Sequence, residues 1–355
     1  MLSKILYILL AIVILGVIII CHEFGHFIVG RMCGIGVVEF SVGFGPKLLG
    51  WKRKDTQYSL RAIPLGGYCK FVGEDEDNAA PNAMNNANVW KRIATVFAGP
   101  FMNFLLAFLA GIVMLCAFYV SDVLPTVNQV VENSAAYEAG LQSGDAITEV
   151  NGEAIPQNST GIVTLREHVQ AGETVNLTVQ RGKETFSVSV TPEATEDEDG
   201  TTAYQLGVTF TTRKYNLAEA VPASWKMMVN VTEQLFDVLR NLIFHGEGAD
   251  EMTGTVGTVV VISEVVSRDT SMILDIIFLI SLNLGIMNLL PIPALDGGRL
   301  VFLIVEAVRG KPVPPDKEGM VHLIGFALLL VLFVVLTWHD IINIPNLVNL
   351  VGGNS

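Results

Sequence analysis

The chain has 355 residues, of which 51% are hydrophobic and only 16% charged, and its formal net charge is −13. A disordered protein would not combine so much apolar sequence with so little charge, and a nucleic-acid-binding protein would normally carry a basic patch. The four cysteines form no CxxC pair or regular framework, so neither a disulfide scaffold nor a thiolate zinc site is indicated. A membrane protein, or an unusually apolar soluble one, remains.

The distribution of apolar residues predicts a polytopic α-helical membrane protein with about four transmembrane helices. Four runs with at most one charged residue each cover 5–21, 93–120, 272–290 and 323–337. Seventeen uncharged residues in the first run are about the length that a bilayer requires. A cleavable signal peptide is the alternative for this run, but its apolar part is long and no small-residue cleavage site follows.

The positions of Lys and Arg predict the orientation in the membrane. Nine of them lie between Arg31 and Arg92, four more lie between Arg299 and Lys317, and none follows Trp338. Loops rich in these residues stay in the cytoplasm. A four-span arrangement puts both basic loops on one side, so both termini and the 121–270 segment are expected to be extracytoplasmic.

The 121–270 segment begins with sequence typical of a small β-rich domain. Apolar residues alternate with polar ones over 175–179 and again over 186–190, with a turn at 181–183 between them, which predicts a half-buried hairpin. The acidic run 196–200 is expected to be a solvated loop. From Trp225 on, apolar residues recur at helical spacing and predict an amphipathic helix that lies on the membrane or on the β-rich domain.

The stretch 35–73, on the cytoplasmic side, is rich in glycine and β-forming residues. It predicts short strands and turns. A surface loop and a hairpin dipping towards the membrane are both compatible with its composition. The domains expected are therefore 1–120, 121–212, 213–270 (amphipathic helix and connecting loop) and 271–355.

The first apolar run leads into the sequence His22-Glu23-Phe24-Gly25-His26. Residues four apart on a helix share a face, so both imidazoles could bind one metal ion. Glu23 lies beside them, where it could act as general base on an attacking water. Ionisable groups inside an apolar span are costly and are functional candidates by default. Two histidines that meet water at a helix end are the alternative explanation.

A catalytic zinc site needs a third protein ligand, and the sequence offers two candidates. Glu39 is near in sequence but lies in a glycine-rich stretch. Asp296 follows the third apolar run, where Pro291 and Pro293 are expected to break the helix. Irregular backbone at membrane depth survives only where it lines a buried or wet cavity, so Asp296 is the better candidate. On its own, Asp296 could equally be a turn or N-cap aspartate.

These motifs resemble those of the site-2 protease family, and most closely its bacterial RseP-type branch of regulated intramembrane zinc metalloproteases. The resemblance rests on HEFGH in the first span, on NLLPIPALDGG at 288–298, and on the outward domain between them. That domain resembles a single PDZ domain of the permuted bacterial kind, through Ser134-Ala135-Ala136, the segment 139–145 and the strand 147–150 before Asn151-Gly152. The resemblance covers nearly the whole chain.

The resemblance implies roles for individual residues. His22, His26 and Asp296 would bind one Zn²⁺ per chain, with Glu23 as general base. Asn288 would contact the substrate near the scissile bond. The 58–71 segment would be the family's membrane-associated β-hairpin, which holds the extended substrate, and Gly66, Gly67 and Tyr68 would be part of it. In the PDZ-like domain, Leu206, Gly207 and Val208 would form the strand beside the peptide groove.

The resemblance also implies the setting. The protein would lie in the bacterial cytoplasmic membrane and cleave transmembrane segments of single-span proteins, such as an anti-sigma factor or a remnant signal peptide, already trimmed by another protease. Two features depart from the family: there is room for one PDZ domain rather than two, and Gly254-Thr255-Val256-Gly257 replaces Gly-Pro-Val-Gly. A non-catalytic PDZ-bearing membrane adaptor with a vestigial metal site is the alternative, as is a surface-cleaving metalloprotease with a glutamate ligand.

Overall fold

A computed structural model describes residues 2–74, 78–196, 202–246 and 253–352. The chain forms two compact units, Met1–Val113 with Val221–Ser355, and Met114–Ala220. The acidic loop expected at 196–200 lies, beyond its first residue, outside the described part of the chain.

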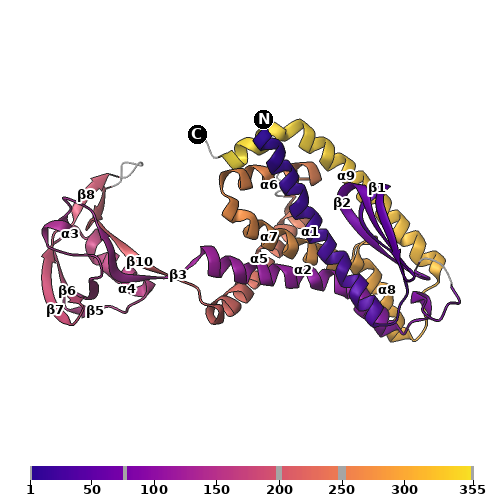
Figure 1. Cartoon of the computed structure of the whole chain (residues 1–355), viewed down its shortest axis with the longest axis horizontal. Coiled ribbons are helices and arrows are strands. Elements are labelled where there is room, and N and C mark those ends of the chain that lie inside the picture. Colours follow the sequence, from indigo (N-terminus) through magenta and orange to yellow (C-terminus); the bar gives the residue numbers. More distant parts are fainter. Residues whose placement is uncertain (1, 75–77, 197–201, 247–252, 353–355) are drawn as a thin grey trace. The chain divides into compact units, whose positions relative to one another are not determined.

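The first unit is built on long apolar helices (Figure 1). Within the described residues, four helical segments are long and apolar enough to cross a membrane, as the sequence predicts: Lys4–Met32, Val89–Phe118, Thr270–Leu289 and Asp316–Ile342. They belong to α1 (Leu2–Met32), α2 (Val89–Phe118), 3₁₀ helix η3 with α7 (Thr270–Met272, Ile273–Leu289) and α9 (Pro315–Gly352). Because α1 continues to Met32, the HEFGH sequence lies inside this helix rather than at its end.

Two further helices of this unit pack against the spans. α5 (Leu217–His245) is amphipathic, as predicted, and packs Met228 and Leu235 against α2 and α7. α6 (Thr255–Arg268) packs Ile262 and Val266 against Ile18 and neighbouring apolar residues of α1. A connecting loop was expected here, and this prediction was wrong, because the apolar face of α6 forms a stable helix only with tertiary partners.

The segment Gly254–Gly257 is the N-cap and first turn of α6. Asp340 of α9 is fully buried and accepts hydrogen bonds from the backbone N–H groups of Gly254 (3.0 Å) and Gly257 (2.7 Å). A carboxylate at a helix N-terminus satisfies amides that have no partner within the helix and complements its dipole. A Cβ atom at either glycine would lie 2.8 Å from a carboxylate oxygen of Asp340. Both glycines therefore allow this contact.

α7 ends at Leu289, and α8 (Asp296–Arg309) begins after an irregular segment with two prolines, as predicted. Ala294 has a left-handed backbone conformation (φ 73°), and its N–H donates to Nδ1 of His322 on α9 (3.0 Å). On α8, Arg299 pairs with Glu74 and Glu306 pairs with Arg92 of α2. These contacts fix the beginning of α8, and with it Asp296, against the rest of the unit.

The 35–73 stretch forms two long strands, β1 (Val37–Arg53) and β2 (Thr56–Phe71), rather than the short strands expected from sequence. Phe40 of β1 lies opposite both Tyr58 and Cys69, so the first part of β1 pairs with both ends of β2. Several register shifts interrupt the pairing of β1 with β2. Each shift breaks the regular alternation of apolar and polar residues, so a long bent strand looks like several short strands in the sequence. The 58–71 segment is thus one strand and not a hairpin by itself. The 3₁₀ helix η1 (Met84–Asn86) follows.

The second unit, Met114–Ala220, contains a sheet with the strand order β10-β3-β4-β6-β7, and β5 pairs with β4. Its strands and helices are β3 (Val120–Val130), α3 (Ala135–Glu138), β4 (Ala146–Val150), β5 (Glu153–Ala154), α4 (Ser159–Gln170), β6 (Val175–Arg181), β7 (Glu184–Val190), β8 (Glu193–Glu196), β9 (Thr202–Gln205) and β10 (Val208–Lys214). The predicted hairpin is confirmed as β6–β7, with Val175 opposite Val190 and Arg181 opposite Glu184. The apolar residues of β6 are buried in the core of this unit.

Asp145 of this unit is fully buried and ion-paired with Arg181 (2.7 Å). Burial alone would raise the pKa of Asp145, but hydrogen bonds from Arg181 and from the Gln142 N–H outweigh it and hold the pKa below its ordinary value of 3.8. A lowered pKa in the folded state stabilises the fold above pH 3.8, and this contribution is lost as the pH falls towards the folded-state value.

We therefore expect Asp145→Asn to destabilise this unit by about 2 kcal/mol at neutral pH, since the bonds from a charged donor are weakened. The difference from the wild type should shrink at acid pH, where the carboxyl of the wild type is protonated too. Native-state hydrogen exchange of residues 114–220 in the full chain measures this. The exposed residue Glu138 provides the control Glu138→Gln, and equal protection in Asp145→Asn and the wild type would contradict the expectation.

Candidate metal centre

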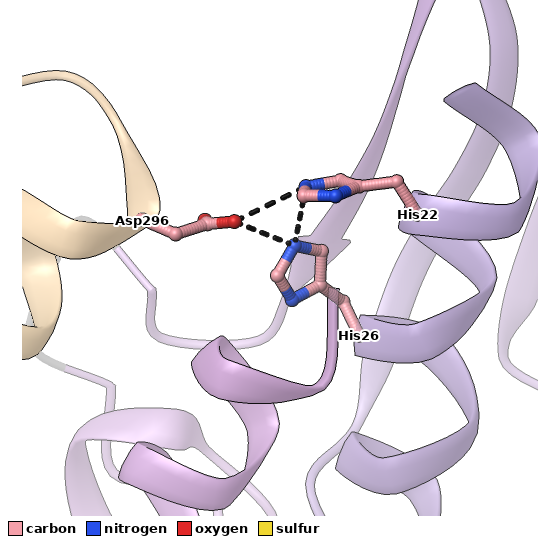
Figure 2. Close-up of side chains that lie close together, drawn as sticks. All are labelled: His22, His26 and Asp296. Carbon is pink, nitrogen blue, oxygen red and sulfur yellow. Dashed lines mark hydrogen bonds and ion pairs between the residues drawn. The ribbon is translucent and has the colours of Figure 1, made fainter. Parts of the chain in front are cut away.

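His22 and His26 lie one helical turn apart on α1 and point the same way (Figure 2). Their Nε2 atoms are 3.2 Å apart, and both residues are buried, at 7% and 9% exposure. This follows from the helical spacing of four residues in the HEFGH sequence.

Asp296, from the beginning of α8, points its carboxylate at the two imidazoles (Figure 2). Its Oδ2 atom lies 3.1 Å from Nε2 of His22 and 3.3 Å from Nε2 of His26. The donor atoms of the three residues all lie within 4.8 Å of one another. Oδ2 is buried without a hydrogen-bond partner, so an acceptor atom and two imidazole nitrogens converge on one point. Two nitrogens and one carboxylate oxygen are a donor set that suits catalytic zinc.

Gly99 of α2 leaves the space between these donors open. A Cβ atom at position 99 would lie 2.9 Å from Nε2 of His22 and would collide with Nε2 of His26. On α1, a Cβ atom at Gly25 would collide with the backbone carbonyl of Ala98. Small residues at both positions let the two helices approach closely, and the donor atoms then face an unfilled volume.

Two further residues of α2 contact the far nitrogens of the imidazoles. Nδ1 of His26 donates to the backbone carbonyl of Thr95 (2.9 Å), and Nδ1 of His22 lies 3.0 Å from Nδ2 of Asn103. Neither Thr95 nor Asn103 is among the site residues predicted from the sequence. Their signal was present, because Thr95, Gly99 and Asn103 recur every four residues in an otherwise apolar run.

Glu23 lies between the histidine face and the β1–β2 sheet. Glu23 and Cys69 of β2 line the same cavity, and a Cβ atom at Gly67 would lie 3.2 Å from Cγ of Glu23. The glycine thus lets the strand pass directly beside Glu23.

The candidate ligands and Glu23 line a cavity of about 250 Å³. Asn288 and Tyr68, two of the substrate-contact residues predicted from sequence, line the same cavity. Nδ2 of Asn288 donates to the Leu284 carbonyl of its own helix (2.9 Å). Leu206, Gly207 and Val208 belong to the other unit. There Val208 begins β10, whereas Leu206 and Gly207 precede the strand, and Leu206 is buried in the core.

Glu39, the alternative third ligand, lies in a different cluster. It accepts a hydrogen bond from Arg61 (2.9 Å), which also donates to the Tyr68 hydroxyl (2.7 Å). Burial alone would raise the pKa of Glu39, but hydrogen bonds, among them the one from Arg61, lower it below the ordinary value. Among the residues that the structure describes, the group able to hold a metal contains Asp296 and not Glu39.

We expect Glu39→Ala to keep a full complement of zinc, because its carboxylate is engaged by Arg61 and not directed at the histidines. The variant should instead loosen the β1–β2 sheet around Arg61 and Tyr68, which hydrogen exchange would detect. Metal analysis of purified Glu39→Ala is the decisive measurement. Protein without zinc would show that Glu39 is a ligand.

Comparison with known proteins identifies the family. The profile of Peptidase family M50 matches residues 10–332. The chain is 30% identical over 411 residues to the regulator of sigma-W protease RasP of Bacillus subtilis, covering 93% of this chain and 97% of that protein. It is 31% identical over 410 residues to the zinc metalloprotease RasP of Geobacillus kaustophilus, covering 93% and 96%. Among solved structures, the PDZ domain of an SdrC-like protein from Listeria monocytogenes matches 25% of this chain and 86% of that domain, with 23% identity and a TM-score of 0.21.

The chain therefore belongs to peptidase family M50, the site-2 protease family. It is a multi-pass membrane protein and a zinc metalloendopeptidase of the site-2 protease type, with zinc as its cofactor. The donor set of His22, His26 and Asp296 fits that cofactor.

Proposed function

We propose that His22, His26 and Asp296 are the zinc ligands of this protease and that Glu23 is its general base. The observation that supports this most strongly is the convergence of two imidazole nitrogens and one buried carboxylate oxygen in a cavity inside the apolar unit. Zinc bound there supplies a Lewis acid that polarises the scissile carbonyl and acidifies the attacking water.

Glu23 takes the proton from the attacking water and passes it to the leaving amine. It lies in the same cavity as the proposed ligands, and this position serves both transfers. Asn288, on the wall of the same cavity, contacts the substrate near the scissile bond.

The substrate is a membrane-spanning segment of a single-span protein, which must be unwound before its peptide bonds can be attacked. We propose that the Gly66–Tyr68 part of β2 pairs with the extended substrate backbone and replaces the lost helical hydrogen bonds. The closeness of Gly67 to Glu23 supports this, because a strand bound there would pass the catalytic base.

We further propose that residues 121–212 act as a PDZ-like domain that selects the substrate. β10 is an edge strand of its sheet, and an edge strand can accept a peptide by strand addition. Leu206, Gly207 and Val208 lead into this edge. The free edge of β10 would then bind the new terminus of a substrate already cut by another protease.

The substrate class we propose is an anti-sigma factor or a remnant signal peptide. The name of the Bacillus subtilis relative, regulator of sigma-W protease, supports the first of these. From the distribution of Lys and Arg, we propose a location in the bacterial cytoplasmic membrane, with the PDZ-like domain and both termini extracytoplasmic.

Comparing the membrane proteomes of cells that contain the wild type or Glu23→Gln tests the proposal. We expect short membrane-spanning fragments, already trimmed on their outer side, to accumulate only with Glu23→Gln. Fragments that derive from secretory precursors would identify signal peptides as the substrates, and fragments of regulatory proteins would identify anti-sigma factors. Indistinguishable proteomes would favour the adaptor alternative.

A further inference from the structure

The two candidate histidine ligands differ in how their second nitrogen is held. Nδ1 of His26 faces a backbone carbonyl, that of Thr95, at 2.9 Å. A carbonyl can only accept, so the proton of His26 sits on Nδ1 and the lone pair on Nε2 faces His22 and Asp296. The tautomer that binds metal through Nε2 is therefore already fixed for His26.

Nδ1 of His22 faces the side-chain amide of Asn103, with Nδ2 at 3.0 Å. Asn103 is completely buried, and its Oδ1 atom has no hydrogen-bond partner. Nε2 of His22 points at Asp296 (3.1 Å) and at His26 (3.2 Å). For Nε2 to offer a lone pair there, Nδ1 must carry the proton, and that proton needs an acceptor rather than the NH₂ group of Asn103.

A half-turn of the Asn103 amide supplies this acceptor. The oxygen and nitrogen of an amide are nearly identical in shape, so the two orientations occupy the same space. In the turned orientation, Oδ1 leaves the position in which it has no partner and accepts from Nδ1 of His22. The proposed ligand set requires this orientation, and Asn103 Oδ1 has no other hydrogen-bond partner that the turn would break.

We propose that Asn103 is a positioning residue of the metal centre: its Oδ1 accepts the Nδ1 proton of His22 and fixes the tautomer that binds zinc. This inference rests on the proposed ligand set. Thr95 does the same for His26, and Gly99, halfway between them on the same face of α2, leaves room for the ion. One face of α2 thus sets the tautomers of both ligands on α1. Loss of such an outer-shell partner typically weakens metal binding by about 10–100-fold.

The test measures zinc affinity by chelator competition in the purified full-length protein. Asn103→Leu keeps a similar volume but has no acceptor, and we expect its affinity to fall by about 10–100-fold. Asn103→Asp offers only acceptors, and we expect it to bind zinc as tightly as the wild type or more tightly. A role of the NH₂ group as donor predicts the opposite, with Asp at least as harmful as Leu.

Two controls separate this inference from the ligand assignment and from general damage. His22→Ala should lose zinc whatever Asn103 does; retention of zinc there would overturn the ligand set. Asn283→Leu makes the same chemical change at an exposed position of α7 and should leave zinc affinity unchanged. Wild-type affinity in Asn103→Leu, or no rescue by Asn103→Asp, would overturn the role of Asn103. If Asn103→Leu fails to fold, the affinity of Asn103→Asp decides alone.

Discussion

Glu23→Gln should bind zinc like the wild type and lose proteolytic activity by about 100–10,000-fold, the range that a positioned general base contributes. Glutamine has nearly the same shape as glutamate, so the donor atoms of His22, His26 and Asp296 should stay in place. Its amide, however, cannot take a proton from the attacking water. Cleavage of a membrane-spanning substrate in detergent or liposomes, together with metal analysis of the same preparation, measures both quantities.

The zinc content is the control in this experiment. Activity lost together with zinc would assign Glu23 a role in holding the metal centre rather than in proton transfer. Activity within tenfold of the wild type would contradict its role as the base.

Asp296→Ala should lose both zinc and activity. The substitution removes the carboxylate that lies within 3.3 Å of both imidazoles and leaves two nitrogen ligands, whereas a catalytic zinc site uses three protein ligands. We expect zinc affinity to fall by more than about 100-fold, beyond what the loss of an outer-shell partner costs. Chelator competition and metal analysis of the purified protein measure this.

Asp316→Ala is a matched control, because Asp316 is an exposed aspartate in the first turn of α9. It should keep zinc and activity. Unchanged zinc affinity in Asp296→Ala would remove Asp296 from the ligand set and leave the metal centre without its oxygen donor.

The sequence predicted the membrane spans and the break before Asp296 because both depend on strong local signals. Long runs without charge are typical of membrane spans or signal sequences, and two prolines close together after such a run favour the end of a helix. The hairpin of β6 and β7 was equally clear, since its alternation matches burial on one face. HEFGH revealed two histidines on one helical face.

The features that the sequence did not predict depend on contacts between distant segments. α6 packs against α1, and its N-terminus is capped by the carboxylate of Asp340, which lies more than 80 residues further along the chain. The long strands β1 and β2 are interrupted by register shifts, which erase the regular alternation on which strand prediction depends. The spacing of Thr95, Gly99 and Asn103 marks one face of α2, but the contact of Asn103 with His22 joins residues 81 positions apart and needs α1 and α2 to pack.

X-ray absorption at the zinc edge of the purified wild type measures which atoms bind the zinc. It is expected to show two imidazole nitrogens at about 2.0–2.1 Å and a carboxylate oxygen at about 2.0–2.2 Å, and the bound zinc is expected to be lost in His22→Ala. A sulfur neighbour at about 2.3 Å, or a spectrum unchanged in His22→Ala, would contradict a zinc centre formed by His22, His26 and Asp296.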